Sequence, residues 1–587
     1  MRSTPTWFSP TESSRLQGLL RGILAWARRP AVLGAVVGAL GFLHYQNFAL
    51  LDPTNVHAFI AGDWGTHMLG WLHFRHAPLG HLPLGQVPHL GYPLGTSLLF
   101  TDAIPLLALG LRPVSALLPT DFQYLGLWLL ASFVLQGALG AQIAALYLPS
   151  RVAIGASAVL FVLMPASLIR NVHPALTAHW ILLAVLYGAL RGPHRTRWGL
   201  VTLVSLATLI QPYLWAFAVI LLLGVLLDDV RRGAATWVLA TASGAACLAA
   251  SLGLLALVGG FTAGYQTATG GFGSYSANLL TFVAPNGTSR FLHLDTPPTQ
   301  LEGFAYLGLG VLALQAIVGV LSLRDRRRRH PGDSRSVRGV PLATGVAVGL
   351  LAAFAVSDHV FVGSREVLTL AWVYDPIRPL AEKFRCSGRA IWPLMYLLVV
   401  LAIGGLQRSL TRSTRRPERT AALVLTLCAG IQGVDLAFTN RYDEMTRYFF
   451  DKSGPYFVER LGDPRWKRIG AEDYRHMAVV PTTLYGCDGG VRYEEGYYSG
   501  RIALLSLEAY RANLTFNSGY FSRWQVNVAE SCAAQNQAAS ARLDADTVYI
   551  FGDGHHPPPG SRCDALNGIH VCVSAQNADP FARSLGP

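Results

Sequence analysis

Long apolar runs separated by short basic connectors fill the first three quarters of the sequence, and they constrain the fold more than any other feature. A helix of roughly 20 apolar residues crosses a hydrocarbon core of about 30 Å, and several of the runs reach that length. Charged residues make up 14% of the 587-residue chain. A typical soluble domain has about 25%. We therefore predict a polytopic α-helical membrane protein.

The basic residues are concentrated in the connectors. The chain carries a net charge of +13, which could indicate a nucleic-acid partner if the arginines formed one surface. They lie instead between apolar runs, as the positive-inside rule expects of cytoplasmic loops. Examples are Arg28-Arg29, His194–Arg197, Arg231-Arg232, Arg324–Arg329 and Arg412–Arg419. We therefore predict membrane lipids, and no nucleic acid, as the partner of this charge.

With these connectors on the cytoplasmic side, the sequence predicts about eleven transmembrane helices. Residues 1–30 are expected to form a cytoplasmic amphipathic segment, and residues 31–439 a membrane domain with a long first outer loop, residues 51–121. The run Leu98–Leu118 is not counted, because a span there would place the later arginines outside; a re-entrant or interfacial segment is expected. The predicted spans are Ala31–Leu50, Phe122–Leu148, Val152–Ile169, Leu176–Leu190, Leu200–Ile210, Tyr213–Leu227, Ala234–Phe261, Gly303–Leu323, Val340–Val356, Ala390–Leu406 and Ala421–Phe438.

Residues 440–587 are polar and are predicted to form an extracytoplasmic globular domain of α/β or α+β type. Strands are expected at Met477–Pro481, Asn513–Phe516, Thr547–Phe551 and Ile569–Val573. Four cysteines in this domain suggest two disulfides in an oxidising compartment, with free thiols in a reduced domain as the alternative. They are Cys487, Cys532, Cys563 and Cys572. Three pairings are open, and the short separation favours Cys563 with Cys572.

The first outer loop contains an expected amphipathic helix, Gly62–Trp71. Asp63 and His67 fall on one stripe of this helix and face one cavity, whereas Trp64 and Trp71 on the adjoining stripe are expected in the membrane interface. A carboxylate in such a place could act as a general base. The alternative is that Asp63 only caps the helix.

Further polar residues are expected on the same outer face. Arg385 and Arg389, one helical turn apart, are a candidate phosphate clamp, although single arginines at a membrane boundary often extend to lipid headgroups. Histidines there often only pack. The candidate substrate-binding residues are His67, Arg75, Asp102, His173, His179, Gln211, Tyr275, Asn278, Arg385 and Arg389.

Nucleotide motifs are absent from the sequence: there is no Walker loop and no dinucleotide fingerprint. An ATP-driven pump is therefore disfavoured. Paired metal-binding motifs are also absent, so we predict no cofactor, with a divalent cation left open but unsupported by any motif.

The architecture resembles that of GT-C glycosyltransferases, which have a long first outer loop with an aspartate near its start, the place of Asp63. Four segments look like recurrent patterns of an uncharacterised bacterial membrane-protein family grouped with these enzymes. They are Gly62–Arg75, Arg170–Trp180, Gly271–Leu280 and Phe384–Pro393. The likeness covers roughly Leu51 to Pro393.

The resemblance implies an inverting hexosyl or pentosyl transferase of the bacterial inner membrane. Its donor would be a polyprenyl-phosphate-linked sugar, and its acceptor would lie in the periplasm, together with the C-terminal domain. By resemblance, Asp63 would be the general base, and Arg385 and Arg389 would stabilise the leaving phosphate. Asp63-Trp64 replaces the Asp-Glu pair of protein mannosyltransferases, and the Trp-Trp-Asp motif of oligosaccharyltransferases is missing. A glycan or lipid-linked acceptor is therefore expected.

Two other classes remain open. A transporter or flippase of lipid-linked saccharides usually shows internal repeats and ionisable residues near the bilayer midplane, and neither is detected here. A non-catalytic assembly partner would tolerate loss of Asp63.

Overall fold

A computed structural model describes residues 29–60, 62–78, 80–192, 197–262, 264–265, 271–327, 339–437, 461–470, 472–484, 487 and 500–586. The predicted amphipathic segment 1–30 lies outside these ranges except for its last two residues. Residues 440–460, where the C-terminal domain was predicted to begin, also lie outside them.

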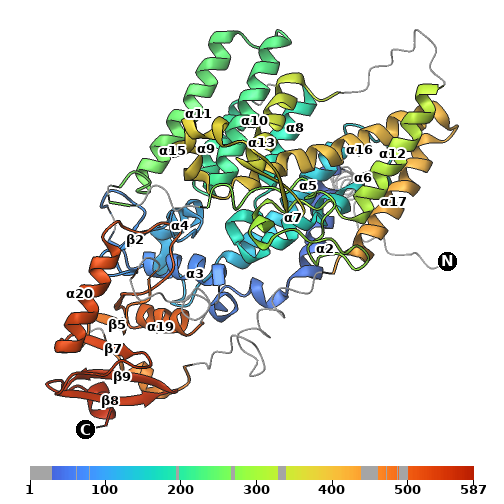
Figure 1. Cartoon of the computed structure of the whole chain (residues 1–587). Helices are drawn as coiled ribbons and strands as arrows, with labels where there is room; N and C mark the ends of the chain where they lie inside the picture. Colours follow the sequence, from blue (N-terminus) through green and yellow to red (C-terminus); the bar gives the residue numbers. More distant parts are fainter. Residues whose placement is uncertain are drawn as a thin grey trace, which may run out of the picture.

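Helices dominate the part before residue 438, and a small sheet domain follows (Figure 1). The helices of the first part are α2 (Pro30–Tyr45), α3 (Gly62–Phe74), α4 (Pro105–Leu111), α5 (Leu125–Ala144), α6 (Arg151–Val162), α7 (Pro165–Ile169), α8 (Trp180–Arg191), α9 (Arg197–Ala207), α10 (Pro212–Arg231), α11 (Trp237–Leu257), α12 (Leu309–Arg327), α13 (Leu342–Val356), α14 (Ala371–Tyr374), α15 (Arg378–Ala381), α16 (Trp392–Ser413) and α17 (Pro417–Asp435). Short strand pairs join β1 (Gln86–Val87) to β2 (Thr96–Ser97) and β3 (His359–Val362) to β4 (Arg365–Thr369).

The expected number of eleven spans is wrong, although each predicted range contains a helix. Within the described residues, five helices are long and apolar enough to cross a membrane, or six if the pair Arg151–Val162 and Pro165–Val172, bent by 43°, counts as one. The other helices are too short or too charged: α9 has 11 residues and α13 has 15. At 1.5 Å per residue, these reach only about 16 and 23 Å. The chain is thus a membrane protein with fewer full-length spans than its apolar runs suggest.

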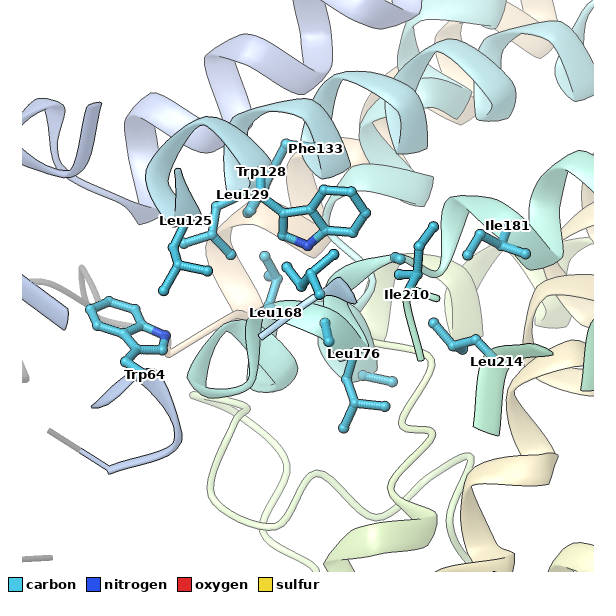
Figure 2. Packing of buried hydrophobic residues seen from close by; sticks show 14 of the residues in the cluster. Trp64, Leu125, Trp128, Leu129, Phe133, Leu168, Leu176, Ile181, Ile210 and Leu214 are labelled. Carbon is cyan, nitrogen blue, oxygen red and sulfur yellow. The ribbon is translucent and has the colours of Figure 1, made fainter. Parts of the chain in front are cut away.

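Small residues let the first helix approach the bundle closely. Gly34 and Gly38 of α2 face α5, and a Cβ built at Gly34 would lie 2.1 Å from the carbonyl oxygen of Gly137. Without side chains at these positions the two backbones touch, which is a common way for helices to pack in lipid. Behind them, Leu125, Trp128, Leu129 and Phe133 of α5 belong to the continuous buried core drawn in Figure 2.

Several helices expose apolar side chains at helical spacing. Leu342, Val346 and Leu350 of α13 are 58%, 52% and 63% exposed, and they recur every four residues along one face. Helix α17 has a similar face with Leu423, Leu427, Ile431 and Val434. Such faces suit lipid contact.

The C-terminal domain is built on a five-stranded sheet with the order β6-β5-β7-β9-β8. Strand β5 (His476–Val480) runs parallel to β6 (Thr515–Phe516) and β7 (Thr547–Phe551), whereas β8 (Ser561–Leu566) and β9 (Ile569–Ser574) form an antiparallel hairpin at one edge. Helices α19 (Gly500–Arg511), α20 (Val528–Ala541) and α21 (Pro580–Ser584) accompany it. The four predicted strands are confirmed, but β8 was missed because Ser-Arg-Cys-Asp-Ala-Leu lacks β-branched residues.

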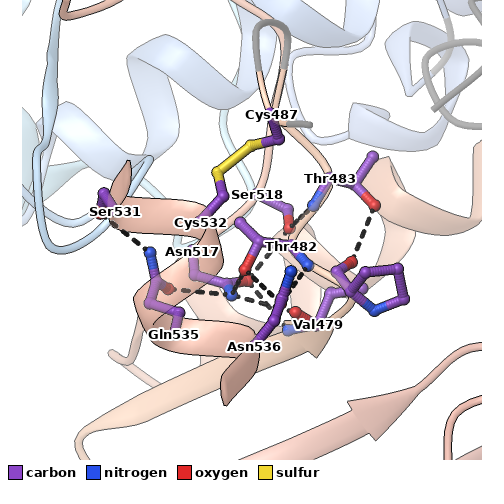
Figure 3. The surroundings of a disulfide bond; sticks show 11 residues. Val479, Thr482, Thr483, Cys487, Asn517, Ser518, Ser531, Cys532, Gln535 and Asn536 are labelled. Atoms are coloured by element: carbon purple, nitrogen blue, oxygen red, sulfur yellow. Dashed lines mark hydrogen bonds between the residues drawn. A yellow bond between two sulfur atoms is a disulfide. The ribbon is translucent and has the colours of Figure 1, made fainter. Parts of the chain in front are cut away.

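Two disulfides join the four cysteines of this domain. Cys487 is bonded to Cys532 of α20 (Figure 3), and Cys563 of β8 to Cys572 of β9. The latter two residues are direct partners in the strand register. Cys247, Cys386 and Cys428 are free and buried.

The sheet domain lies against the first outer loop, and Figure 1 shows α19 beside the blue α3. The contact is made by backbone as well as side chains: the Phe516 N–H donates to the His89 carbonyl (2.8 Å), and the Tyr92 N–H donates to the Phe516 carbonyl (3.0 Å). The loop thereby adds to the edge of the domain next to β6, so the two parts form one structure.

Candidate functional site

Glu302 and Arg389 are brought together by two glycines. Gly303 follows Glu302, and Gly388 precedes Arg389. A Cβ at Gly388 would lie 2.6 Å from the Cα of Gly303. The Gly388 N–H donates to the Tyr275 carbonyl (2.9 Å), which adds a third segment to the contact. The close approach needs residues without side chains, and it places an acidic and a basic residue from distant segments side by side.

A buried ion-pair cluster is centred on Glu302. Arg389 Nε donates to Glu302 Oε2 (2.7 Å), and Arg170 Nη2 lies 3.2 Å from the same oxygen. Arg170 also donates to the Leu301 carbonyl (2.9 Å). Burial alone would raise the pKa of Glu302, but the two guanidinium groups hold it well below its ordinary value.

Both arginines of the cluster also lie over aromatic rings. The Arg389 guanidinium is 4.7 Å from the centre of the Tyr213 ring, and that of Arg170 is 5.6 Å from the Trp392 ring. Cation–π contacts of this kind fix the planar head groups as well as stabilising their charge.

Next to this cluster lies a carboxylate–histidine pair from two different loops. Asp102 Oδ2 is 3.5 Å from His173 Nε2, and the His173 ring meets the His67 ring edge-on at 4.6 Å between centroids. The Asp102 backbone is in the left-handed region (φ 54°), which is unusual for a residue other than glycine. Burial would raise the pKa of Asp102, but His173, with Arg389 nearby, holds it below its ordinary value.

His67 has a structural role within this group. Its Nδ1 contacts the Asp63 carbonyl (2.6 Å) and its Nε2 accepts from the Ala175 N–H (3.3 Å), so Nδ1 carries the proton. Burial, with His173 nearby, lowers the pKa of His67 to about 3. His67 is therefore neutral and positions the segment that carries His173.

Asp63 lies in the first turn of α3 and is partly buried. Its backbone carbonyl is the one that His67 contacts, and the neighbouring Trp64 donates from Nε1 to the Asn171 carbonyl (2.6 Å). The start of α3 is thus packed on the segment that also holds Arg170 and His173.

Sequence reasoning missed the contribution of the C-terminal domain. Arg385 is hydrogen-bonded to Tyr520, and Arg523 donates to the Lys383 carbonyl (3.3 Å). Burial lowers the pKa of Arg523, and Arg385 and Asp102 are close enough to influence it. Four guanidinium groups, those of Arg170, Arg385, Arg389 and Arg523, therefore gather around two carboxylates. We call these six residues, with His173, the arginine cluster.

Glu302 was also missed, and a signal for it did exist. It is a single carboxylate directly before an apolar run, at the same predicted boundary as the arginines. Ionisable residues at such a boundary usually pair. Tyr520 and Arg523 had no such signal, because nothing in the sequence places a loop of the C-terminal domain against residue 385.

Other predicted site residues make structural contacts. Arg75 donates to the carbonyls of Ser115, Leu118, Pro119 and Thr120 and to the Tyr510 hydroxyl, so it holds the loop and the C-terminal domain. Asn278 bonds Gln300 and the Gly363 backbone, and Gln211 caps α10. Tyr275 contributes its backbone carbonyl to Gly388.

His179 is fully buried next to the cluster. Its Nδ1 contacts the Tyr396 hydroxyl (2.8 Å), and its ring lies 4.3 Å from that of Trp392, on which Arg170 stacks. His179 therefore supports the Trp392 ring on which Arg170 stacks.

The expectation that Trp64 and Trp71 lie in the membrane interface is wrong. Each is 1% exposed, and Trp71 donates from Nε1 to the Phe122 carbonyl (2.9 Å). Their indole N–H groups find partners inside the protein, so burial carries no hydrogen-bonding penalty.

One group of potential metal ligands is found among the described residues. The ligand atoms of Cys563, His570 and Cys572 lie within 4.8 Å of one another. Since the two cysteines form a disulfide, they offer no thiolates to a metal ion.

The fold and the cluster define a helical membrane protein with a polar, arginine-rich centre closed by a C-terminal sheet domain. The chain belongs to the family described as Domain of unknown function (DUF6311), whose model matches residues 35–437. The model of the DUF6311 C-terminal domain matches residues 465–574. No curated protein matches the chain.

Proposed function

We propose that the chain is a membrane glycosyltransferase of GT-C type. It would transfer a sugar from a polyprenyl-phosphate donor to a glycan or lipid-linked acceptor outside the cytoplasm, with inversion. The observation that carries the proposal is the arginine cluster: a surplus of buried and partly buried guanidinium groups, at the end of apolar helices, beside a carboxylate–histidine pair.

The arginines would act on the leaving group. When the bond between the anomeric carbon and the phosphate oxygen breaks, the oxygen keeps the electron pair, and its growing negative charge needs fixed donors. Glu302 holds Arg170 and Arg389 in place. Arg385 makes no ion pair with a carboxylate of the described residues, so its charge is available to a phosphate.

A carboxylate of the first outer loop would act on the acceptor. The acceptor hydroxyl oxygen attacks the anomeric carbon, and its proton passes to the base. The contacts favour Asp102 in this role, because it is buried, held by His173 and close enough to Arg389 to interact electrostatically. Asp63 stays the prediction from the sequence, and its position one turn before His67 keeps it near the same group.

We place the protein in the bacterial inner membrane, with a cytoplasmic N-terminus and a periplasmic C-terminal domain. The two disulfides support this side, since disulfides persist in oxidising compartments. Alkaline phosphatase fused after residue 587 should be active, whereas activity of a cytoplasmic reporter at that position would contradict the topology.

The decisive experiment is sugar transfer in membranes that contain the full chain. Radiolabelled polyprenyl-phosphate sugars are supplied, and label leaving the carrier is measured. Arg385→Gln should lose about a hundredfold or more of the rate, the usual effect of removing one donor to a developing anion. Arg191→Gln is the matched control, because Arg191 ends α8 and is exposed.

Two outcomes would contradict the proposal. One is that no donor in the set loses label, and the other is that both arginine variants fall equally. Movement of intact labelled donor across the membrane without transfer would favour the transporter.

A further inference from the structure

A cavity of about 540 Å³ lies in the C-terminal domain on one face of its sheet. Strands β5 and β7 form its floor, α20 forms one side, and Tyr92 of the first outer loop closes it from the other part of the molecule. Its volume is within the usual range of about 300–1,000 Å³ for small-molecule sites. We call it the Tyr92 groove.

An aromatic wall is fixed at one end of the Tyr92 groove. The rings of Tyr92 and His476 are stacked, 4.4 Å apart at 23°. His476 Nδ1 contacts the Thr515 hydroxyl (2.7 Å), and the Tyr92 backbone is bonded to Phe516. Because these contacts hold both residues in place, ligand binding costs little conformational entropy at the aromatic wall.

Hydrogen-bonding groups line the rest of the groove. Asp544, Asp546 and Gln535 contribute side chains, and the Asp546 side chain is 46% exposed. Asn517 lies deeper and uses its amide on Val479, Thr482 and Gln535, so it shapes the floor (Figure 3). The groove therefore combines a rigid floor with carboxylates open to a ligand.

The charge of the lining restricts the class of ligand. Among the described residues that line the Tyr92 groove, two are aspartates and none is lysine or arginine. Phosphates, nucleotides and acidic sugars would be repelled by the two carboxylates, and the lining offers them no permanently cationic side chain. A ligand with many hydroxyl or amino groups and an apolar face suits both the carboxylates and the aromatic rings.

We propose that the Tyr92 groove is a saccharide-binding site, selective for neutral or amino sugars. The groove and the arginine cluster are near one another in the chain: Asn517 lines the groove, Arg523 belongs to the cluster, and six residues span at most about 22 Å. Binding at the groove does not depend on the transfer reaction, so the two proposals can fail separately.

The test is binding of the detergent-purified full chain to an array of neutral, amino and acidic oligosaccharides, followed by calorimetric titration of the strongest neutral or amino hit. Tyr92→Ala should weaken that titration about tenfold, whereas Tyr92→Phe keeps the ring and should stay within about threefold. Asp546→Asn should also weaken it, and Asp553→Asn, an exposed acid outside the groove, should not.

Asp546→Asn removes no packing, so it keeps the test valid even if Tyr92→Ala disturbs the contact between loop and domain. The proposal is overturned if nothing on the array binds, if only acidic glycans bind, or if the titration is the same for wild type, Tyr92→Ala and Asp546→Asn. Binding of a lysine-rich peptide in place of every glycan would equally overturn it.

Discussion

The two ends of helix α3 both carry histidines and charges, yet they have different surroundings. At its start, Asp63 and His67 pack on the segment of Arg170 and His173, next to Asp102. At its end, His73 and Arg75 contact the C-terminal domain through Ser506 and Tyr510. The helix therefore connects the arginine cluster to the docked sheet domain.

The difference between the two ends of α3 helps to distinguish candidate catalytic residues from residues with a structural role. At the end of α3, backbone carbonyls take up the donors, as the four carbonyls around Arg75 show. At the start, the Asp102 carboxylate faces His173, with arginines close by. Exchanges at the start should therefore affect catalysis, and exchanges at the end should affect docking.

The largest effect is expected at the start. Asp102→Asn keeps the size of the side chain but removes the proton acceptor, and loss of a positioned base costs about a hundredfold to ten-thousandfold in rate. Asp63→Asn should be affected much less. Rates of sugar transfer are compared at matched protein amounts and with matched thermal stability. If Asp63→Asn is inactive and Asp102→Asn is near wild type, the base is Asp63.

A smaller effect, on stability alone, is expected at the end. Arg75→Ala removes charged hydrogen bonds to the segment 115–120 and to Tyr510, each worth about 1.5–3 kcal/mol. The C-terminal domain should become more sensitive to protease, with most of the transfer rate retained once intact protein is counted. Arg75→Lys, which reaches fewer acceptors, should lie between. If the variant resists protease like the wild type but transfers no sugar, Arg75 acts in the transfer site.

Acid should also loosen this end. Burial lowers the pKa of His73 to about 3 and, with help from His89 and Arg75, that of His76 to about 4. Both histidines are neutral in the docked state. In the released state their pKa is near 6.5, so the free energy of docking is fully present above pH 6.5 and decreases as the pH falls toward 4. At pH 5.5 the loss is about 1 kcal/mol for His73 and less for the more accessible His76.

Protease sensitivity measured between pH 7.5 and 5 reads out this effect. His73→Gln should flatten the profile, whereas His44→Gln, outside the contact, should not. A profile that is flat for the wild-type chain would show that the histidines are not protected by docking.

The smallest effect is expected for the ion pair of Arg511 with Asp121 (2.6 Å), because both side chains are about a third exposed. Partly exposed pairs contribute about 0–1 kcal/mol. Asp121→Asn should leave thermal stability within that range. A loss as large as that of Arg75→Ala would mean that the whole contact, and not Arg75, holds the domain.

Local patterns in the sequence were enough for the helices and for most strands. Apolar periodicity located α5, α10 and α16, and β-branched runs located β5, β7 and β9. The number of spans could not be predicted in the same way, because α9 and α13 are mainly apolar but too short to cross a bilayer alone. Apolar character reports burial in protein and burial in lipid alike.

Only those residues of the site that the predicted topology places on the outer side of the membrane could be predicted. Asp102, His173, Arg385 and Arg389 were placed near one another by topology, and the contacts described agree with that for Asp102 and His173. The partners of the arginines could not be predicted. The Gly303–Gly388 contact brings Glu302 to Arg389, and the docking of the C-terminal domain brings Tyr520 to Arg385. Both depend on tertiary packing between distant segments.

The bond between Cys487 and Cys532 encloses Tyr520 and Arg523 within the stretch of chain that it closes. Both residues follow Lys383 and Arg385 in the sequence by more than 130 positions, so they are synthesised after the segment that they contact. The arginine cluster is thus incomplete until the C-terminal domain has been synthesised and has docked. Folding of this domain, with the disulfide that closes the stretch around Tyr520 and Arg523, is then the step that completes the cluster.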